Sequence, residues 1–177
     1  MDALEVLQFD IIKPDMVVAD VGTGGGWPLL ALAQSYPDTQ FVGIDGRRKK
    51  MEAVQTIAIE SWLNNVETQR SRIEQVRWSY DIVTARAVAY ADVLLEWIHP
   101  ILKPWGYMIL YKLDTEEENM IIRRWCERNR YDVHIQHPYQ LNDDKQGLRS
   151  TKQETKRILR ILKKHRSHEQ SKKRKSK

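Results

Sequence analysis

The sequence predicts a doubly wound α/β fold built around a mostly parallel sheet of seven strands. Short apolar runs alternate along the chain with segments of helical periodicity, and a glycine-rich loop joins the first strand to the first helix. The last two expected strands have only a polar stretch between them, which is consistent with a closing antiparallel pair. Ligands of such sheets bind at the carboxyl ends of the strands, so residues that directly follow strands are the functional candidates.

The first half of the chain alternates three expected strands with two expected helices. Residues 16–21, 40–44 and 66–71 are the strands, of which the third is the weakest. Residues 27–36 form the first expected helix, with Pro28 at its first position, where no backbone N–H is required. The second helix covers 47–62, because apolar residues recur there at helical spacing. They are Met51, Val54, Ile57, Ala58 and Trp62.

The second half continues the alternation and then closes the sheet. Residues 80–85 are the fourth strand, 92–98 a helix, and 107–112 the fifth strand after the turn Lys103-Pro104-Trp105-Gly106. Thr115 is a typical N-cap of a helix that begins with three glutamates and carries arginines later, in the order that complements the helix dipole. The last expected strands are 131–137 and 157–162, separated by a polar loop at 142–155.

Length and charge indicate one folded domain with a basic tail. The 177 residues suit a single domain, expected at 1–164, followed by a tail at 165–177 that is predicted to be disordered. The net charge is +5, yet residues 163–177 hold eight Lys or Arg and one Glu, so the rest of the chain carries 5 − 7 = −2. Such a tail attracts phosphate non-specifically; it can equally be a solubilising terminus.

Other features favour a cytoplasmic protein, which is expected to be a monomer. No run approaches the ~20 apolar residues that cross a bilayer, and no signal-peptide pattern is present. The single cysteine, Cys126, cannot form an internal disulfide and is expected to be a buried apolar residue. The His and Cys residues show no metal-binding spacing, so no metal is expected. The dispersed tryptophans are interpreted as core or partial core; they are Trp62, Trp78, Trp97, Trp105 and Trp125.

The glycine loop carries the strongest functional signal. It reads D-x-G-x-G-x-G through Asp20, Gly22, Gly24 and Gly26, whereas the third glycine of a dinucleotide fingerprint would fall on Trp27. A carboxylate at the strand end can meet a cationic amino-acid group but would repel a pyrophosphate. This spelling resembles motif I of the class I (Rossmann-like) S-adenosylmethionine-dependent methyltransferases. The alternative is a tight turn without a ligand.

The ends of the other strands supply further candidates. Asp45 can accept hydrogen bonds from both ribose hydroxyls, and it can also serve as a helix N-cap or turn residue; the two roles are compatible. Arg72-Ile73-Glu74 follows the third strand, where it can frame an adenine ring. Arg86 and Lys112 end the fourth and fifth strands and should face the same crevice. Cations there suit phosphate or guanine, although solvated surface residues are the commoner case.

Together these segments resemble the GidB (RsmG) family, the bacterial small-subunit ribosomal RNA guanine-N-7 methyltransferases. The matching segments are DVGTGGGWP, Asp45 with the following Arg-Arg-Lys-Lys, Ser71-Arg72-Ile73-Glu74, YDIVTARAVA, Leu102-Lys103-Pro104 and the strand ending at Lys112. The resemblance covers about residues 2–164. Family members carry a helical segment before the first strand, and here only about fifteen residues precede it, so that segment is expected to be lacking.

The resemblance implies a cofactor, a reaction and roles for the site residues. S-adenosyl-L-methionine would donate a methyl group to N-7 of a guanine in ribosomal RNA or the small subunit. This atom carries no proton, so no general base is needed, and positioning and electrostatics would do the catalysis. Arg86 and Lys112 would be catalytic. The cofactor-binding residues would be Asp20, Gly22, Thr23, Gly24, Asp45, Arg72, Ile73, Glu74 and Arg86.

Two alternatives remain open at this stage. One is a class I methyltransferase with a different substrate, either a small molecule or a protein. The other is a non-catalytic homologue that binds RNA or the ribosome. The intact Asp20, Gly22, Gly24 and Asp45 argue against the second alternative, because a protein without the cofactor has no physical need for them.

Overall fold

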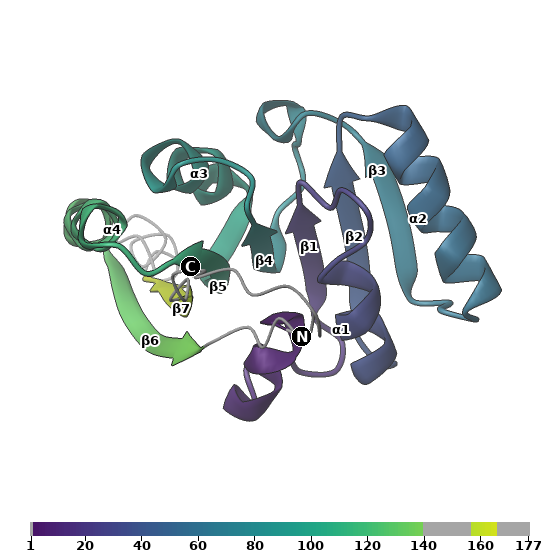
Figure 1. Ribbon diagram of the computed structural model, residues 1–177, viewed down its shortest axis with the longest axis horizontal. Helices are drawn as coiled ribbons and strands as arrows, with labels where there is room; N and C mark the ends of the chain where they lie inside the picture. The colour runs from purple at the N-terminus through teal and green to yellow at the C-terminus, as the bar shows by residue number, and fades with distance from the viewer. Residues whose placement is uncertain (1, 140–156, 166–177) are drawn as a thin grey trace, which may run out of the picture.

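A seven-stranded sheet forms the centre of the molecule, in the order β3-β2-β1-β4-β5-β7-β6 (Figure 1). The computed structural model describes residues 2–139 and 157–165. β7 runs antiparallel to both its neighbours, and the other paired strands are parallel. The expected fold class and the closing antiparallel pair are confirmed. The predicted loop at 142–155 and the tail beyond residue 165 lie outside the described residues.

The first half of the chain forms one side of the sheet. A 3-10 helix, η1 (Asp2–Phe9), precedes β1 (Val17–Val21), and α1 (Leu29–Ser35), β2 (Gln40–Asp45), α2 (Arg48–Glu60) and β3 (Val66–Arg70) follow. The strands agree closely with the predicted ranges. α1 is shorter than expected, because residues 22–28 belong to the glycine loop and Pro28 occupies the N-cap position rather than the first helical one.

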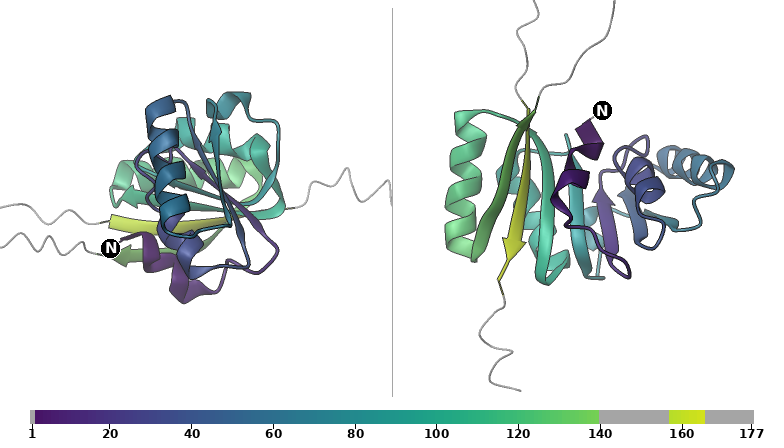
Figure 2. Two further views of the ribbon diagram at one scale, coloured as in Figure 1. Left: turned by 90° about the vertical axis from the view of Figure 1, so that its right-hand side faces the viewer. Right: turned by 90° about the horizontal axis from the view of Figure 1, so that it is seen from below.

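The second half forms the other side of the sheet and its closing edge. The short η2 (Ile73–Gln75) leads to β4 (Tyr80–Arg86), α3 (Ala91–Ile98) and η3 (His99–Ile101). Next come β5 (Leu102–Leu113), α4 (Glu116–Asn129), β6 (Tyr131–Tyr139) and β7 (Arg157–Lys164). Figure 2 shows β7, in yellow, beside β6 at the edge farthest from β3.

β5 begins earlier than predicted. The segment expected as a turn lies within it, because Leu102 already pairs with Tyr80. The pairing then shifts, so that Tyr107 lies opposite Ile82, and Trp105 has a positive φ of 68°. The turn residues therefore form an irregularity inside the strand rather than a break before it.

The side chains that alternate along the strands divide the core into two layers. One layer packs α3 and α4 against the sheet through Leu94, Leu95, Ile122 and Trp125. The other packs α1, α2 and η1 against the opposite face through residues such as Leu32 and Val54. Helices therefore cover both faces, as expected for parallel strands whose two sides are buried.

The prediction that the tryptophans belong to the core was wrong for three of them. Trp62, Trp78 and Trp105 are 85%, 73% and 52% exposed. Trp62 lies in the turn after α2, Trp78 in the loop before β4, and Trp105 in the irregular start of β5. Trp125 is buried, and Trp97 packs against the core from its edge. Cys126 is buried as predicted, and burial raises the pKa of its thiol to about 12.

Candidate active site

The glycine loop after β1 is a tight turn held close to its neighbours. Gly22, Gly24 and Gly26 have φ values of 67°, 57° and 93°, a region that residues with side chains rarely adopt. A Cβ at Gly22 would lie 2.7 Å from Val88 Cγ2, in the segment that follows β4. The backbone N–H of Gly22 donates to the carbonyl of Ile44 on β2, at 2.8 Å. The loop therefore fills the space between the ends of β2 and β4.

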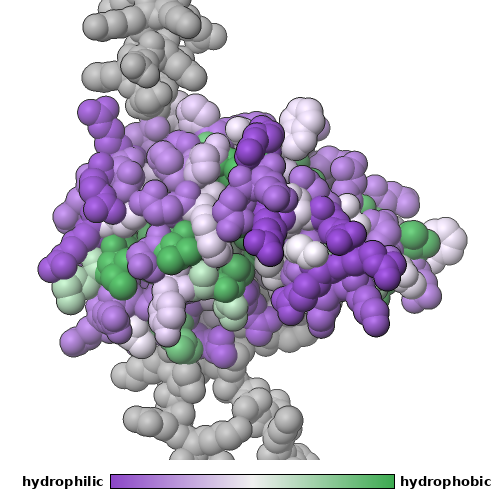
Figure 3. Space-filling view, turned by 90° about the horizontal axis from the view of Figure 1, so that it is seen from above, coloured by the Kyte–Doolittle hydropathy of each residue, from purple (hydrophilic) through white to green (hydrophobic). Residues whose placement is uncertain are grey.

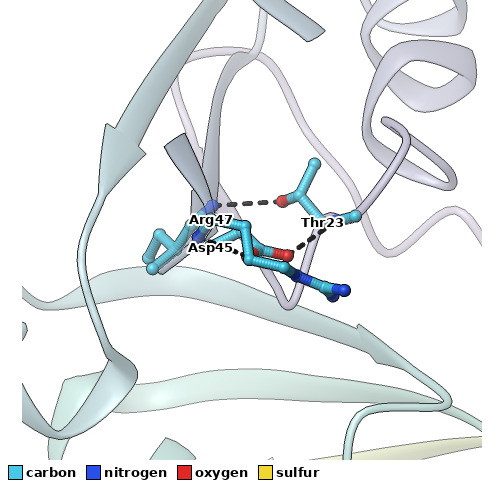
Figure 4. A network of polar contacts seen from close by, with 5 residues as sticks. Thr23, Asp45 and Arg47 are labelled. Carbon is cyan, nitrogen blue, oxygen red and sulfur yellow. Dashed lines mark hydrogen bonds and ion pairs between the residues drawn. The ribbon is translucent and has the colours of Figure 1, made fainter. Parts of the chain in front are cut away.

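Thr23 fastens this loop to β2. Its buried hydroxyl donates to the carbonyl of Asp20, at 2.7 Å. The same hydroxyl accepts from the backbone N–H of Ile44, at 3.1 Å (Figure 4). Both bonds shape the loop. The predicted contact of Thr23 with a cofactor is not among them and stays a prediction.

Asp20 lies beneath the loop, and its two carboxylate oxygens differ in their hydrogen bonding. It is 1% exposed, and its Oδ1 accepts from the Thr84 hydroxyl at 2.7 Å. Its buried Oδ2 has no hydrogen-bond partner within the described part of the chain. Burial raises the pKa of Asp20 to about 7, although the threonine hydroxyls and the charge of Arg86 act in the opposite direction. A cationic group placed beside Oδ2 would satisfy this oxygen.

Asp45 lies at the end of β2, where its carboxylate bridges the loop and the start of α2. Oδ2 accepts from the backbone N–H of Gly24 at 3.1 Å, and Oδ1 accepts from the backbone N–H of Arg47 at 2.9 Å (Figure 4). Burial alone would raise the pKa of Asp45, but the bonds from Arg47 and Gly24 bring it below its usual value. The N-cap of α2 is Arg47, so Asp45 is a turn residue and not the cap.

Most of the predicted cofactor residues converge on one cleft of about 320 Å³, hereafter the cofactor cleft. Gly22, Asp45, Arg72, Ile73 and Glu74 all line it. Val88 and Trp97 also line it, and neither was among the predicted site residues. Val88 lies in the segment YDIVTARAVA, which could have indicated it, whereas Trp97 belongs to no motif. Asp20, Thr23 and Gly24 belong to the loop and the strand end beside it.

The two predicted catalytic cations occupy different surroundings. Arg86 ends β4 opposite Tyr111 of β5, close enough for its charge to act on Asp20. Lys112 is 8% exposed, and its Nζ donates to the carbonyl of Ala89, at 2.6 Å, and pairs with Glu118 Oε1, at 3.0 Å. Lys112 therefore holds the segment after β4 in place. It also lines a second pocket of about 440 Å³.

Residues 2–139 and 157–165 contain neither a membrane-spanning helix nor a cluster of metal-binding side chains. No helix there has the length and apolar character needed to cross a bilayer. No group of three or more His, Cys, Asp or Glu residues is placed to hold a metal ion.

Sequence comparisons connect this fold and site with one family. The model of the GidB family, described as rRNA small subunit methyltransferase G, matches residues 1–142. A protein of that name from Chlorobium phaeobacteroides is 40% identical over 96 residues, covering 54% of this chain and 43% of the relative. Another from Deinococcus radiodurans is 36% identical over 126 residues, covering 68% and 50%. The chain thus spans about half the length of these relatives.

Solved structures share the fold at low sequence identity. TrmN from Thermus thermophilus superposes with a TM-score of 0.71 at 16% identity, over 92% of this chain and 48% of that one. The ribosomal protein L11 methylase from Lactobacillus delbrueckii gives a TM-score of 0.67 at 18% identity, over 92% and 77%. These likenesses support the fold, and the match to the family model covers most of the sequence. The chain belongs to the GidB family, the rRNA small subunit methyltransferases G.

Proposed function

We propose that this protein transfers a methyl group from S-adenosyl-L-methionine to N-7 of a guanine in small-subunit ribosomal RNA. The observation that carries the proposal is the cofactor cleft, where residues from the ends of β1, β2 and β3 meet beside a buried carboxylate. Family membership supports the same substrate, because the relatives are named for ribosomal RNA.

The residues of the cleft fit this cofactor. The unpaired Oδ2 of Asp20 suits the amino group of the methionine part, and the Asp45 carboxylate suits the ribose hydroxyls. Ile73 and its neighbours would contact the adenine ring. When bound, the cofactor supplies an electrophilic methyl group on a sulfonium. The protein has no proton to remove from N-7, so its part is to hold the base and to exclude water.

An exposed group of cations beside the cleft supports an RNA substrate. Arg47 and Arg72 line the cofactor cleft, while Arg48 and Arg70 line the adjoining groove along α2 and β3. Figure 3 views the molecule from above in Figure 1, toward the carboxyl ends of β1 and β2, and strongly hydrophilic side chains predominate on its right half. Exposed cations at the mouth of an active site attract phosphates over several ångströms. We also propose that the protein acts as a monomer in the cytoplasm.

Methyl transfer to defined RNA tests the proposal. Labelled S-adenosylmethionine would be incubated with small ribosomal subunits and with naked ribosomal RNA, both lacking this modification. The digest of either substrate is expected to contain labelled 7-methylguanosine at one position. Asp45→Ala should lose at least about tenfold in kcat/KM, since it removes charge-assisted bonds. Asp38→Ala, an exposed change outside the cleft, is the control. No label on either RNA, or label on another atom, would refute the proposal.

A further inference from the structure

The second pocket, of about 440 Å³, adjoins the cofactor cleft. Val88 lines both, so one side chain separates the two spaces. Residues 87–90, the end of β5 and the first turns of α4 enclose the second pocket, and its volume is in the range of small-molecule sites. Its walls include Val88, Leu113 and Ile121, and apolar side chains gather on the left half of the face in Figure 3. Such walls suit the flat faces of a nucleobase.

An ion pair in the wall adds polarity to this apolar space. Lys112 and Glu118 both line the pocket, with Nζ and Oε1 at 3.0 Å, and their side chains are 8% and 14% exposed. A lysine ammonium has three N–H donors, and the contacts to Ala89 and Glu118 occupy two of them. Glu118 Oε2 is buried and has no hydrogen-bond partner among the described residues. The pair therefore has a spare donor beside a carboxylate with an unused acceptor.

A second buried cation stands behind this pair. Arg160 of β7 is fully buried, with its Nη2 3.6 Å from Asp114 Oδ1, and it also interacts electrostatically with Glu118. Glu118 thus forms an ion pair with Lys112 of β5 and interacts electrostatically with Arg160 of β7. A glutamate carboxylate accepts hydrogen bonds, whereas a lysine ammonium only donates them.

The order of donor and acceptor matches one edge of guanine. Along its Watson–Crick edge, guanine presents the O6 acceptor followed by the N1–H and N2–H donors. We propose that Lys112 donates to O6 and that Glu118 accepts from N1–H and N2–H, so that this pair selects guanine in the second pocket. The five-membered ring, which carries N-7, is then left toward Val88. Adenine has a donor and an acceptor in the opposite order, so it would leave both groups unpaired.

This inference rests on the proposed function, and nucleotide binding tests it without methyl transfer. GMP, IMP and AMP would be titrated into the protein in the presence of S-adenosylhomocysteine, with affinity followed by NMR. Wild-type protein is expected to bind GMP about tenfold more tightly than IMP, which lacks the N2 amino group, and more tightly still than AMP. In Glu118→Gln the amide can donate to adenine N1, so the preference for GMP over AMP should fall about tenfold.

Glu116→Gln is the matched control, because Glu116 is exposed in the same helical turn and does not line the pocket. It should keep the wild-type preferences. An equal loss of affinity for all three nucleotides in Glu118→Gln would mean that Glu118 only holds Lys112 in place, and the proposal would be wrong. An absence of preference between GMP and IMP in the wild type, which requires no variant, would overturn it as well.

The two proposals fail in different ways. A guanine preference that depends on Glu118, without 7-methylguanosine in ribosomal RNA, would refute the proposed reaction and keep the base-reading pair. Methylation of ribosomal RNA with unchanged preferences in Glu118→Gln would refute the pair and keep the reaction.

Discussion

At the residue scale, Asp20 is the clearest case of a site that costs stability. A carboxylate that is fully buried with one unpaired oxygen is unfavourable in a folded protein unless something binds to it. Burial moves the pKa of Asp20 to about 7, so the free protein holds the proton over most of the acidic range. Under the proposed function, the amino group of the bound cofactor would favour the ionised form of Asp20.

Replacing Asp20 by Asn should therefore change how stability depends on pH. The pKa in the folded state, about 7, lies above the ordinary value of 3.8, so ionisation destabilises the folded protein progressively as the pH rises from about 4 to 7. Without cofactor, Asp20→Asn should lose this pH dependence and gain up to roughly 4 kcal/mol relative to wild type at pH 8. Urea unfolding of the wild type and the variant at pH 5 and pH 8 measures this difference in the free energy of unfolding. An identical pH dependence in both proteins would contradict the assignment.

At the element scale, the first turns of α4 and α2 carry opposite charges. α4 begins with three glutamates and is capped by Thr115, whose hydroxyl accepts from the backbone N–H of Glu118. α2 has no acidic residue in its first turn and begins with Arg48, Lys49 and Lys50. Cations at a helix N-terminus are unfavourable by several tenths of a kcal/mol each. A local rule broken beside the cofactor cleft points to function rather than stability.

Reversing the charges at the start of α2 separates their effect on stability from their effect on RNA binding. The double variant Lys49→Glu/Lys50→Glu should raise the free energy of unfolding by about 1 kcal/mol, because acidic residues complement the dipole. It should also weaken binding to ribosomal RNA and lower the slope of log affinity against log salt by about 2. Chemical unfolding and RNA titrations at three salt concentrations give both quantities. The reversal of Glu116 and Glu117 on α4 serves for comparison, and lower stability is expected there. RNA affinity that is unchanged in the α2 variant would exclude this surface.

At the scale of the whole molecule, parallel strand order brings distant residues to one edge. β1 lies between β2 and β4, so the glycine loop meets Asp45 on one side and Val88 on the other. The cofactor cleft and the second pocket lie on either side of Val88, and both open on the same edge. A ligand bound in the cleft would therefore tie together the ends of three strands.

Ligand binding should accordingly stabilise the entire fold. At about 100 times its Kd, S-adenosylhomocysteine should add about 2.7 kcal/mol, or roughly 5–10 °C in Tm for a domain of this size. Gly22→Ala should abolish this shift, since a Cβ there meets Val88 and the backbone has a positive φ. Gly25→Ala is the control, because nothing lies within 4 Å of a Cβ at that position. Differential scanning fluorimetry reads both, and equal shifts in the two variants would disprove the tight fit at Gly22.

Local patterns in the sequence determined the order of the elements and much of the cofactor cleft. Alternating periodicities identified the strands, and the glycine spacing with Asp45 and Arg72-Ile73-Glu74 identified residues that do converge. These features depend on neighbours along the chain, so they can be read without a structure. The irregular start of β5 could not, because its pairing with β4 depends on a strand elsewhere in the chain.

Only the tertiary structure determined which side chains from distant segments lie next to one another. The sequence presents Glu118 as a helix-dipole residue and Lys112 as a lone cation, whereas folding joins them in the wall of one pocket. In the sequence Arg160 is only a basic residue of a late strand. In the structure β7 lies between β5 and β6, and Arg160 is buried beside Asp114. Burial and pairing arise from contacts between segments far apart in the chain, and no local spacing encodes those contacts.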